Sequence, residues 1–383
     1  ENCITHLHSG RRQPGSATMK KNIFVHYFLS ALIVACCLPT IVNGTGQSSA
    51  PQEDKTTMER KAIEVSVPFV TLRNRTGETE PANYYGGSRG RLEAGFCTVS
   101  FSPIWGLEDI AETVPFYIPD EKIELVNLQE ASLETLERGI KSLPDKEHGN
   151  LVLYIHGYNI GFEKSCRRGA LLQRALGLEE RLLLFSWPAD GNMLKYTWDE
   201  ADLVWSVPHI AGFLEQVIAA SGDGSVDVVA HSLGARGIVQ ALVRLSYRNS
   251  GRLLINELVL IAPDIDTDMF GQELAQLHSL VRRITVYVSE NDKALKLSQE
   301  VHGYPRLGQA GDNLTIFEEV ESIDISAIGT RRFSGHIYHL FNPEVIDDLA
   351  ELLRTGKSAA QRSRLTAARK EGLRYWLLQP GDE

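Results

Sequence analysis

A serine lies at the junction between a short apolar segment and a helical pattern. Residues Val226–Ala230 are almost all apolar, as in a buried strand, and apolar residues between Ile238 and Leu245 recur at helical spacing. The pentapeptide Ala230-His231-Ser232-Leu233-Gly234 joins the two with no room for a loop. In such a strand–serine–helix turn, small residues stand two positions before and two after the serine. The pattern predicts that Ser232 is a nucleophile and that the Leu233 N–H helps to bind an oxyanion.

A serine hydroxyl is a weak nucleophile at neutral pH, so it needs a histidine base and an acid that orients the histidine. Enzymes built around this turn carry the acid and then the histidine downstream of the serine. Four histidines follow Ser232, and His336 stands after the last predicted strand and before the final amphipathic helix. We therefore predict His336 as the base and keep His339 as the alternative base.

Two acidic segments follow predicted strands and could supply the acid. Asp292 follows the strand Ile284–Val288, and Asp264 follows the strand Leu253–Ile261. The strand count favours Asp292. Asp264 stays open as the alternative acid, because some enzymes of this kind carry the acid one strand earlier. The structural alternative for Asp264 is a helix cap, a common position for aspartate.

A second oxyanion donor is expected in the loop that follows an earlier strand. The segment Ile155–Asn159 reads Ile-His-Gly-Tyr-Asn at the end of an apolar run. Gly157 allows the backbone to approach a ligand closely. We predict that the Tyr158 N–H is the second donor and interpret His156 as a structural histidine.

The elements that must position these residues alternate along the chain. Strands are predicted at Leu151–Ile155, Arg181–Phe185, Leu253–Ile261, Ile284–Val288 and Leu314–Val320, and helical patterns at Phe162–Leu176, Trp198–Ala220 and from Asn342-Pro343 onward. Upstream, Val65–Leu72 and Phe96–Phe101 read as strands on either side of a loop at Asn83–Gly90, and Leu128–Ile140 reads as a helix. This alternation predicts an α/β fold with a mostly parallel central sheet and helices on both faces.

Several of these blocks together resemble the bacterial α/β-hydrolases grouped as domain of unknown function 900. The resemblance rests on Ile155–Asn159, Phe185–Pro188, Tyr196 with Asp199, Ala230–Gly234, Ala262–Asp264, Asp292 with Ala294-Leu295, and Gly335-His336, and upstream on Val67–Arg73 and Arg89–Arg91. It runs roughly from Ile63 to Leu353, with differences at Leu233 and Ala235-Arg236 that bear on helix packing. It implies an α/β-hydrolase fold with a serine-hydrolase site and says little about the substrate.

Composition and charge narrow the function classes. The chain has 383 residues, of which 43% are hydrophobic, and a formal net charge of −10. A negative charge argues against nucleic-acid binding, which needs a basic surface. The five cysteines form no C-x-x-C pattern, and no His, Asp or Glu set has metal-ligand spacing, so we expect no metal and no cofactor.

The N-terminal segment has the features of an export signal. Two lysines and a mostly apolar stretch follow Met19, so residues 1–18 are interpreted as lying upstream of the true start, and 19–44 as a signal peptide or anchor. Cleavage after Val42-Asn43-Gly44, lipidation of Cys36 in a lipobox-like segment, and retention in a membrane are all left open. We expect an exported protein that is periplasmic or membrane-anchored, attached to the membrane through this segment if it is retained or lipidated.

The remaining boundaries follow from composition. Residues 45–60 read as a disordered linker, 61–356 as the hydrolase domain and 357–383 as a basic C-terminal helical extension. Cys97 and Cys166 fall within the hydrolase domain, and the sequence leaves open whether they form a disulfide. The oligomeric state is also left open.

The sequence thus predicts an exported serine hydrolase that cleaves small-molecule or lipid carboxylic esters through an acyl-enzyme. The same triad could act on an amide or a thioester, or transfer an acyl group. A non-catalytic envelope protein that binds a lipid or a partner is the alternative of a different class. Trp187, Pro188, Met193 and Trp198 are candidates to line an acyl pocket, whereas Trp205 is expected in the core.

Overall fold

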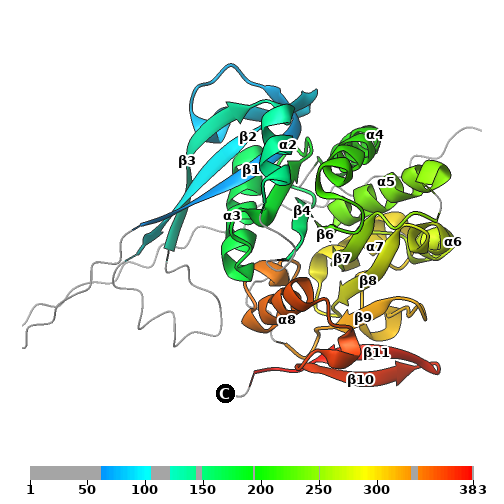
Figure 1. The fold of residues 1–383 in the computed structure, drawn as a ribbon. Helices are drawn as coiled ribbons and strands as arrows, with labels where there is room; N and C mark the ends of the chain where they lie inside the picture. The colour runs from blue at the N-terminus through cyan, green and yellow to red at the C-terminus, as the bar shows by residue number, and fades with distance from the viewer. Residues whose placement is uncertain are drawn as a thin grey trace, which may run out of the picture. The chain divides into compact units, whose positions relative to one another are not determined.

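Strands and helices alternate along most of the described chain, and the strands form one large sheet (Figure 1). The computed structural model describes residues 62–104, 121–143, 149–192, 195–249, 251–328 and 335–381. Within these residues the sheet has eleven strands, in the order β10 (Leu365–Lys370), β11 (Leu373–Leu378), β9 (Glu321–Asp324), β8 (Val281–Val288), β7 (Ile255–Ile261), β6 (Val226–His231), β4 (Leu151–Ile155), β5 (Leu182–Ser186), β1 (Ile63–Arg75), β2 (Tyr85–Pro103) and β3 (Glu121–Ala131).

The middle of the sheet is parallel and both of its ends are antiparallel. Strands β1, β5, β4, β6, β7, β8, β9 and β11 pair in parallel with their neighbours, whereas β2 and β3 at one end and β10 at the other run antiparallel. The carboxyl ends of β4, β6, β7 and β8 therefore meet at one edge of the sheet. In open parallel sheets ligands bind at this edge, so a functional site is expected at the carboxyl ends of these strands.

Helices cover both faces of the sheet, as a parallel sheet with buried strands requires. One face carries α2 (Leu133–Lys141), α4 (Tyr196–Ser221), α5 (Leu233–Asn249) and α6 (Thr267–His278), and the other carries α3 (Phe162–Leu176) and α8 (Pro343–Thr355). Strand β4 shows the division clearly: Leu151, Leu153 and Ile155 point into the first core, and Val152 and Tyr154 into the second. The predicted α/β architecture, with helices on both faces of a mostly parallel sheet, is confirmed.

Helix α4 is the one helix of the described residues that is long and apolar enough to cross a membrane. Half of its apolar window is buried inside the protein. Leu203, Ile210 and Leu214 lie in the core that covers the sheet. Its apolar character is thus accounted for by packing, and the helix includes Pro208 without ending there.

The segment predicted as the last strand, Leu314–Val320, is not a strand. Leu314, Ile316 and Val320 are buried in the core, but the Val320 N–H closes a turn onto the carbonyl oxygen of Phe317. The strand that pairs with β8 is the next segment, β9. The apolar residues were thus correctly expected in the core, but they pack there as an irregular segment.

The C-terminal segment predicted as a basic helix forms a hairpin instead. Strands β10 and β11 pair antiparallel around a turn at Glu371-Gly372, where both residues have positive φ. Trp376 and Leu377 of β11 pair with β9, so the hairpin extends the sheet at its edge. The basic residues of this segment thus lie on an edge hairpin. A high content of lysine and arginine does not by itself distinguish a helix from a strand.

Other boundaries also differ from the predictions. The predicted loop at Asn83–Gly90 mostly belongs to β2, and residues before Ala131 form β3 rather than the start of a helix. A helix that was not predicted from the sequence, α7 (Lys293–His302), follows β8. Cys97 and Cys166 are both buried and free. The predictions for residues 1–18, 19–44 and 45–60, and for Met193, lie outside the described residues.

Candidate active site

Ser232 occupies a sharp turn between β6 and α5. β6 ends at His231 and α5 begins at Leu233, so the serine alone makes the connection. Its φ angle is +54°, in the left-handed region that non-glycine residues rarely adopt. The surrounding backbone holds it there, because the Ser232 N–H donates to the carbonyl oxygen of Ile261 over 3.0 Å. The predicted strand–serine–helix turn is therefore present, with the strain that such turns store.

The glycine two positions after the serine is required by a close approach of two chain segments. A Cβ atom on Gly234 would lie 2.4 Å from the carbonyl oxygen of His156 and 2.8 Å from that of Ile155. No side chain fits at such distances. Gly234 thus lets the start of α5 pack directly against the end of β4 and the loop that follows it.

Left-handed backbone recurs around this edge of the sheet. Besides Ser232, Asn159 after β4 has a φ angle of +60° and Ala262 after β7 has one of +45°. Each of these residues lies just beyond the carboxyl end of a parallel strand. Strained backbone of this kind gathers at functional sites, so it marks the same edge that the sheet topology indicates.

Asp292 and His336 are brought into direct contact. The Nδ1 atom of His336 lies 2.7 Å from Oδ2 of Asp292. The other carboxylate oxygen of Asp292 accepts the N–H groups of Ala294 and Leu295, each over 3.0 Å, and so caps α7. An ionised carboxylate only accepts hydrogen bonds, so Nδ1 of His336 carries the proton and Nε2 is the basic nitrogen of the ring. The carboxylate of Asp292 is fully buried and the imidazole is 12% exposed.

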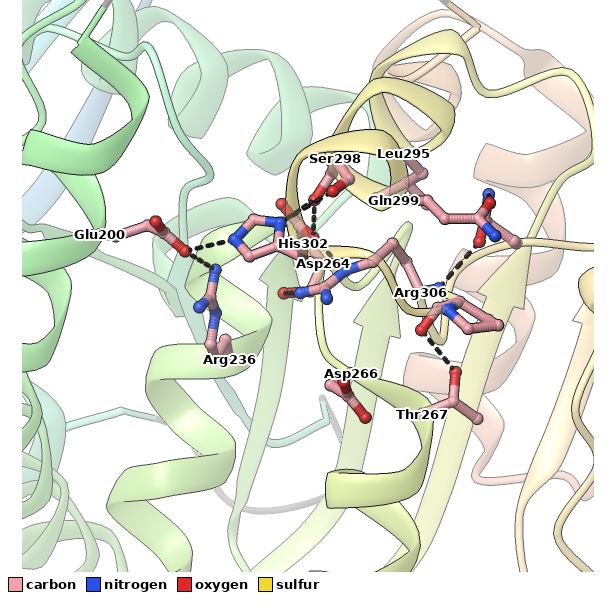
Figure 2. A network of polar contacts seen from close by, with 12 residues as sticks. Glu200, Arg236, Asp264, Asp266, Thr267, Leu295, Ser298, Gln299, His302 and Arg306 are labelled. Carbon is pink, nitrogen blue, oxygen red and sulfur yellow. Dashed lines mark hydrogen bonds and ion pairs between the residues drawn. The ribbon is translucent and has the colours of Figure 1, made fainter. Parts of the chain in front are cut away.

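The side chain of the alternative acid, Asp264, forms an ion pair with Arg306 and accepts hydrogen bonds from two hydroxyl groups. Its Oδ1 accepts from Nε of Arg306 over 2.7 Å and from the Ser298 hydroxyl over 2.6 Å (Figure 2). Its Oδ2 accepts from the Tyr196 hydroxyl over 2.6 Å. Burial raises the pKa of Asp264, but Arg306 and these hydroxyl donors outweigh it and hold the pKa below its usual value. Its backbone N–H, rather than its side chain, contacts the serine, donating to the Ser232 carbonyl oxygen over 3.3 Å. The helix cap expected for Asp264 is instead made by Asp266 at the start of α6.

The alternative base, His339, lies in the core. It is fully buried, and neither of its ring nitrogens has a hydrogen-bond partner among the described residues. Burial, with Arg168 and His336 as smaller causes, lowers the pKa of His339 well below its ordinary value. A histidine without an orienting carboxylate and without access to solvent is poorly suited to shuttle protons.

The loop after β4 lies directly against the serine. A Cβ atom on Gly157 would lie 2.8 Å from Cβ of Ser232 and 2.7 Å from Nδ1 of His231. The backbone of Tyr158 follows this contact, and Leu233 is the first residue of α5, where N–H groups have no partner within the helix. Both predicted oxyanion donors thus belong to backbone that adjoins Ser232, and their role stays a prediction.

The sequence model of the family described as "Alpha/beta hydrolase of unknown function (DUF900)" matches residues 131–355 of the chain. The chain belongs to this family. The expected α/β-hydrolase fold is thereby confirmed, and the matched residues include the serine turn, the Asp292–His336 pair and the loop after β4. The upstream blocks of the resemblance, Val67–Arg73 and Arg89–Arg91, precede the matched residues.

Individual relatives are more distant. The hydrolase is 24% identical over 206 residues to an uncharacterized protein of Nostoc sp., an alignment that covers 39% of this chain and 54% of that protein. The chain thus spans about half the length of this curated relative. Among solved structures it is similar to an esterase of Pyrobaculum calidifontis, at 15% identity, a TM-score of 0.32 and coverage of 56% and 78% of the two chains. A carboxylesterase of Bacillus subtilis is 12% identical, with a TM-score of 0.30 and coverage of 69% and 89%.

Arg73 supports the loop after β4 through hydrogen bonds to its backbone. It is a fully buried arginine of β1 that donates to the carbonyl oxygens of Ile160 over 2.6 Å and Ala189 over 2.8 Å. It also approaches Nε2 of His156 at 3.3 Å. Since arginine only donates, Nε2 of His156 accepts and its Nδ1 carries the proton, which it donates to the carbonyl oxygen of Gly157 over 2.8 Å. Burial and Arg73 lower the pKa of His156 well below its ordinary value, consistent with a neutral ring.

Asp199 links the loop after β4 to the loop after β5. This buried carboxylate accepts the N–H of Asn159 over 3.0 Å and the N–H of Asp190 over 2.9 Å, so it links the loops after β4 and β5. The sequence reading assigned no such role to Arg73 or Asp199 and placed them only within the blocks that resemble the family. A charged residue at the end of an otherwise apolar strand was the signal for Arg73, because such a residue is buried only when its hydrogen bonds are satisfied.

A second polar cluster lies beside the site and joins α4, α5 and α7 (Figure 2). Glu200 accepts from Arg236 over 2.8 Å and contacts Nε2 of His302 at 2.9 Å. Arg236 stands one turn after Ser232 in α5, and the Tyr196 ring packs edge-on against Tyr158 at 5.1 Å. The cluster therefore fixes the elements around the serine relative to one another. It also borders a pocket of about 240 Å³ between α5, α6 and the end of α7.

Of the two tryptophans predicted near an acyl pocket, Trp187 is buried and Trp198 is exposed. Trp187 is fully buried, stacks on His156 with centroids 5.2 Å apart, and donates from Nε1 to the carbonyl oxygen of His156 over 2.7 Å. Pro188 is buried as well, while Trp198 is 61% exposed on α4. Trp205 packs against the core, as expected, with Arg89 over its ring. Trp187 thus supports the start of the loop after β4, and its ring faces the protein interior.

In the described part of the chain, no group of three or more His, Cys, Asp or Glu side chains could hold a metal ion. The candidate site consists of a strained serine, an oriented imidazole and a backbone loop beside them.

Proposed function

We propose that this α/β-hydrolase is a serine hydrolase that cleaves carboxylic esters through an acyl-enzyme, with Ser232, His336 and Asp292 as its triad. The observation that carries the proposal is the 2.7 Å contact between Asp292 and His336 beside a serine held at a φ angle of +54°. The carbonyl oxygen of His336 also lies 2.8 Å from Nε2 of His231, the residue before the serine. These contacts support the proposal because they bring the segment of His336 next to the turn that carries Ser232.

The proposed reaction has two half-steps. Ser232 Oγ attacks the ester carbonyl carbon while Nε2 of His336 takes the hydroxyl proton, and the Asp292 carboxylate stabilises the imidazolium that forms. The N–H groups of Leu233 and Tyr158 stabilise the oxyanion, and one such donor typically contributes about 10²–10³ in rate. The tetrahedral intermediate collapses, and the alcohol leaves with the proton from His336. Water, deprotonated by His336, then releases the carboxylic acid and restores Ser232.

The substrate part of the proposal is an ester of a small molecule or a lipid. The same residues would serve an amide, a thioester or an acyl acceptor other than water. We also propose that the protein is exported and that residues 19–44 direct or anchor it. This part rests on the basic and apolar pattern after Met19. Fractionation of the producing cells, with mass analysis of the mature N-terminus, tests export and distinguishes cleavage, lipidation and retention.

Covalent labelling of the full-length protein tests the chemistry directly. A fluorophosphonate probe reacts with an activated serine, and mass spectrometry of the labelled peptides should place the adduct on Ser232. The Ser232→Ala variant should take up no label, while a folded wild type that takes up none would favour a binding protein over an enzyme. A panel of p-nitrophenyl esters, thioesters and anilides then ranks the substrate classes, with esters expected to turn over fastest.

A further inference from the structure

His231 contacts three segments of the candidate site at once. It directly precedes Ser232, and its Nε2 lies 2.8 Å from the carbonyl oxygen of His336. A Cβ atom built on Gly157 would lie only 2.7 Å from Nδ1 of His231, so the ring lies directly against the Gly157 backbone. Its ring also packs against the ring of His336, with centroids 4.6 Å apart. One buried side chain thus touches the segments that carry the nucleophile, the base and the oxyanion loop.

The hydrogen bonds determine the form of this ring. A backbone carbonyl oxygen only accepts, so Nε2 of His231 carries the proton and donates it to His336. Nδ1 of His231 has no hydrogen-bond partner among the described residues and is closed off by the Gly157 backbone. Burial, with His339, His336 and Arg168 as smaller causes, lowers the pKa of His231 well below its ordinary value. The ring is therefore a neutral, single-donor group beneath the site.

We infer that His231 is a positioning residue that holds the His336 segment against the nucleophile turn through its Nε2–H bond to the His336 carbonyl oxygen. This inference rests on the proposed serine-hydrolase function. The reason is geometric: His336 belongs to a segment 104 positions after Ser232, and the Asp292 contact alone fixes the ring at one atom. The bond from His231 holds the backbone of the same residue, so the two contacts restrain both the ring and the backbone of His336.

A neutral donor suits this position better than a charged one. In the proposed reaction His336 becomes an imidazolium, and a second positive ring with its centroid 4.6 Å away would disfavour that form. His339 makes the contrasting case. It lies equally close to His231, at 4.6 Å, but makes no hydrogen bond to the His336 segment in the described residues. This makes His339 the matched control for loss of a buried imidazole.

The test compares four full-length variants: His231→Gln, His231→Leu, His231→Asn and His339→Leu. Glutamine places an amide donor near the position of Nε2, leucine removes the donor, and asparagine is too short to reach the carbonyl oxygen. For p-nitrophenyl butyrate we expect kcat of His231→Leu and His231→Asn to fall about 10²-fold with little change in KM, as for a misplaced catalytic group. His231→Gln should stay within about tenfold of wild type. Thermal melts confirm that each variant is folded.

A second readout separates positioning from general stability. The downfield proton resonance of the His336 Nδ1–H···Asp292 bond should persist in wild type, His231→Gln and His339→Leu, and broaden or vanish in His231→Leu and His231→Asn. Equal kcat values for folded His231→Leu and His339→Leu would overturn the inference, as would a His231→Gln variant as impaired as His231→Leu. If leucine prevents folding, the comparison of glutamine with asparagine decides. A wild type that is folded but inert toward the ester and the fluorophosphonate probe would instead refute the proposed function.

Discussion

A Cβ atom built on Gly157 would lie 2.8 Å from the Cβ atom of Ser232, although 75 positions separate the two residues in the chain. The contact joins the loop after β4 to the nucleophile turn without an intervening side chain. It brings the loop to the position that the proposed reaction needs, in which its backbone N–H groups would bind the oxyanion formed by attack of Ser232.

Gly157→Ala should damage both activity and stability. The added methyl group would collide with Ser232 and His231, and overpacking of this kind costs about 1–3 kcal/mol. The displaced loop should lower kcat by about 10²-fold or more. Gly161→Ala is the matched control, because a Cβ atom there has no neighbour within 4 Å and the φ angle of −69° suits alanine. Urea unfolding and ester turnover measure both effects, and equal behaviour of the two variants would show that the close contact has no consequence.

Ser232→Gly should abolish turnover yet unfold less readily than Ser232→Ala. Both variants lack the nucleophile, but only glycine adopts a φ angle of +54° without steric cost. Relief of that cost is worth about 1 kcal/mol, which would appear as a higher urea midpoint for the glycine variant. A glycine variant less stable than the alanine variant would mean that the serine turn is not strained.

Asp292→Asn should mainly lower kcat, whereas Asp264→Asn should mainly lower the free energy of unfolding. Loss of the carboxylate that orients His336 should lower kcat by up to about 10⁴-fold, while asparagine can still cap α7. Asp264→Asn breaks a buried ion pair with Arg306, so its main effect should be a loss of about 3–5 kcal/mol of unfolding free energy. Turnover and urea unfolding of both variants, compared at one temperature, test this. A larger fall in kcat for folded Asp264→Asn would transfer the role of acid to Asp264.

His336→Ala should lower kcat by at least about 10³-fold, whereas His339→Ala should change it by less than about tenfold. His336 contacts Asp292, while His339 is buried without a hydrogen-bond partner in the described residues. His339→Ala should instead lose stability, because it leaves a cavity in the core. Ester turnover and thermal melts separate the two effects, and the reverse order of kcat values would identify His339 as the base.

The Asp264–Arg306 pair also predicts how stability depends on pH. The pKa of Asp264 is held below its usual value, so the unfolded chain takes up a proton at this residue before the folded protein does. The stabilisation is therefore fully present above the unfolded pKa of about 3.9 and is lost as the pH falls through the lower, folded pKa. The difference in unfolding free energy between wild type and Asp264→Asn should be constant from pH 5 to 7 and shrink below pH 4. A difference that is independent of pH would mean that the carboxylate itself contributes little.

Much of the central sheet and of the site could be predicted from the sequence. The bounds of β4 and α3 agree with the predicted Leu151–Ile155 and Phe162–Leu176, and the turn around Ser232 lies where the pentapeptide placed it. These features depend on neighbours in the chain. Apolar runs, helical periodicity and small residues beside the serine act over a few positions, so they are visible in the sequence alone.

Tertiary contacts decided the rest. Strands far away in the chain decided that β9, and not Leu314–Val320, pairs with β8. They also decided that the C-terminal segment becomes an edge hairpin and not a helix. The same holds for the choice between Asp292 and Asp264, since both follow strands and only the folded chain brings His336 to one and Arg306 to the other. Arg73 and Asp199 support the loop after β4 through hydrogen bonds that bridge distant segments. The sequence determined the local turns that can hold a nucleophile, and the tertiary structure decided which charged groups face it, because electrostatic partners are selected by distance in space and not along the chain.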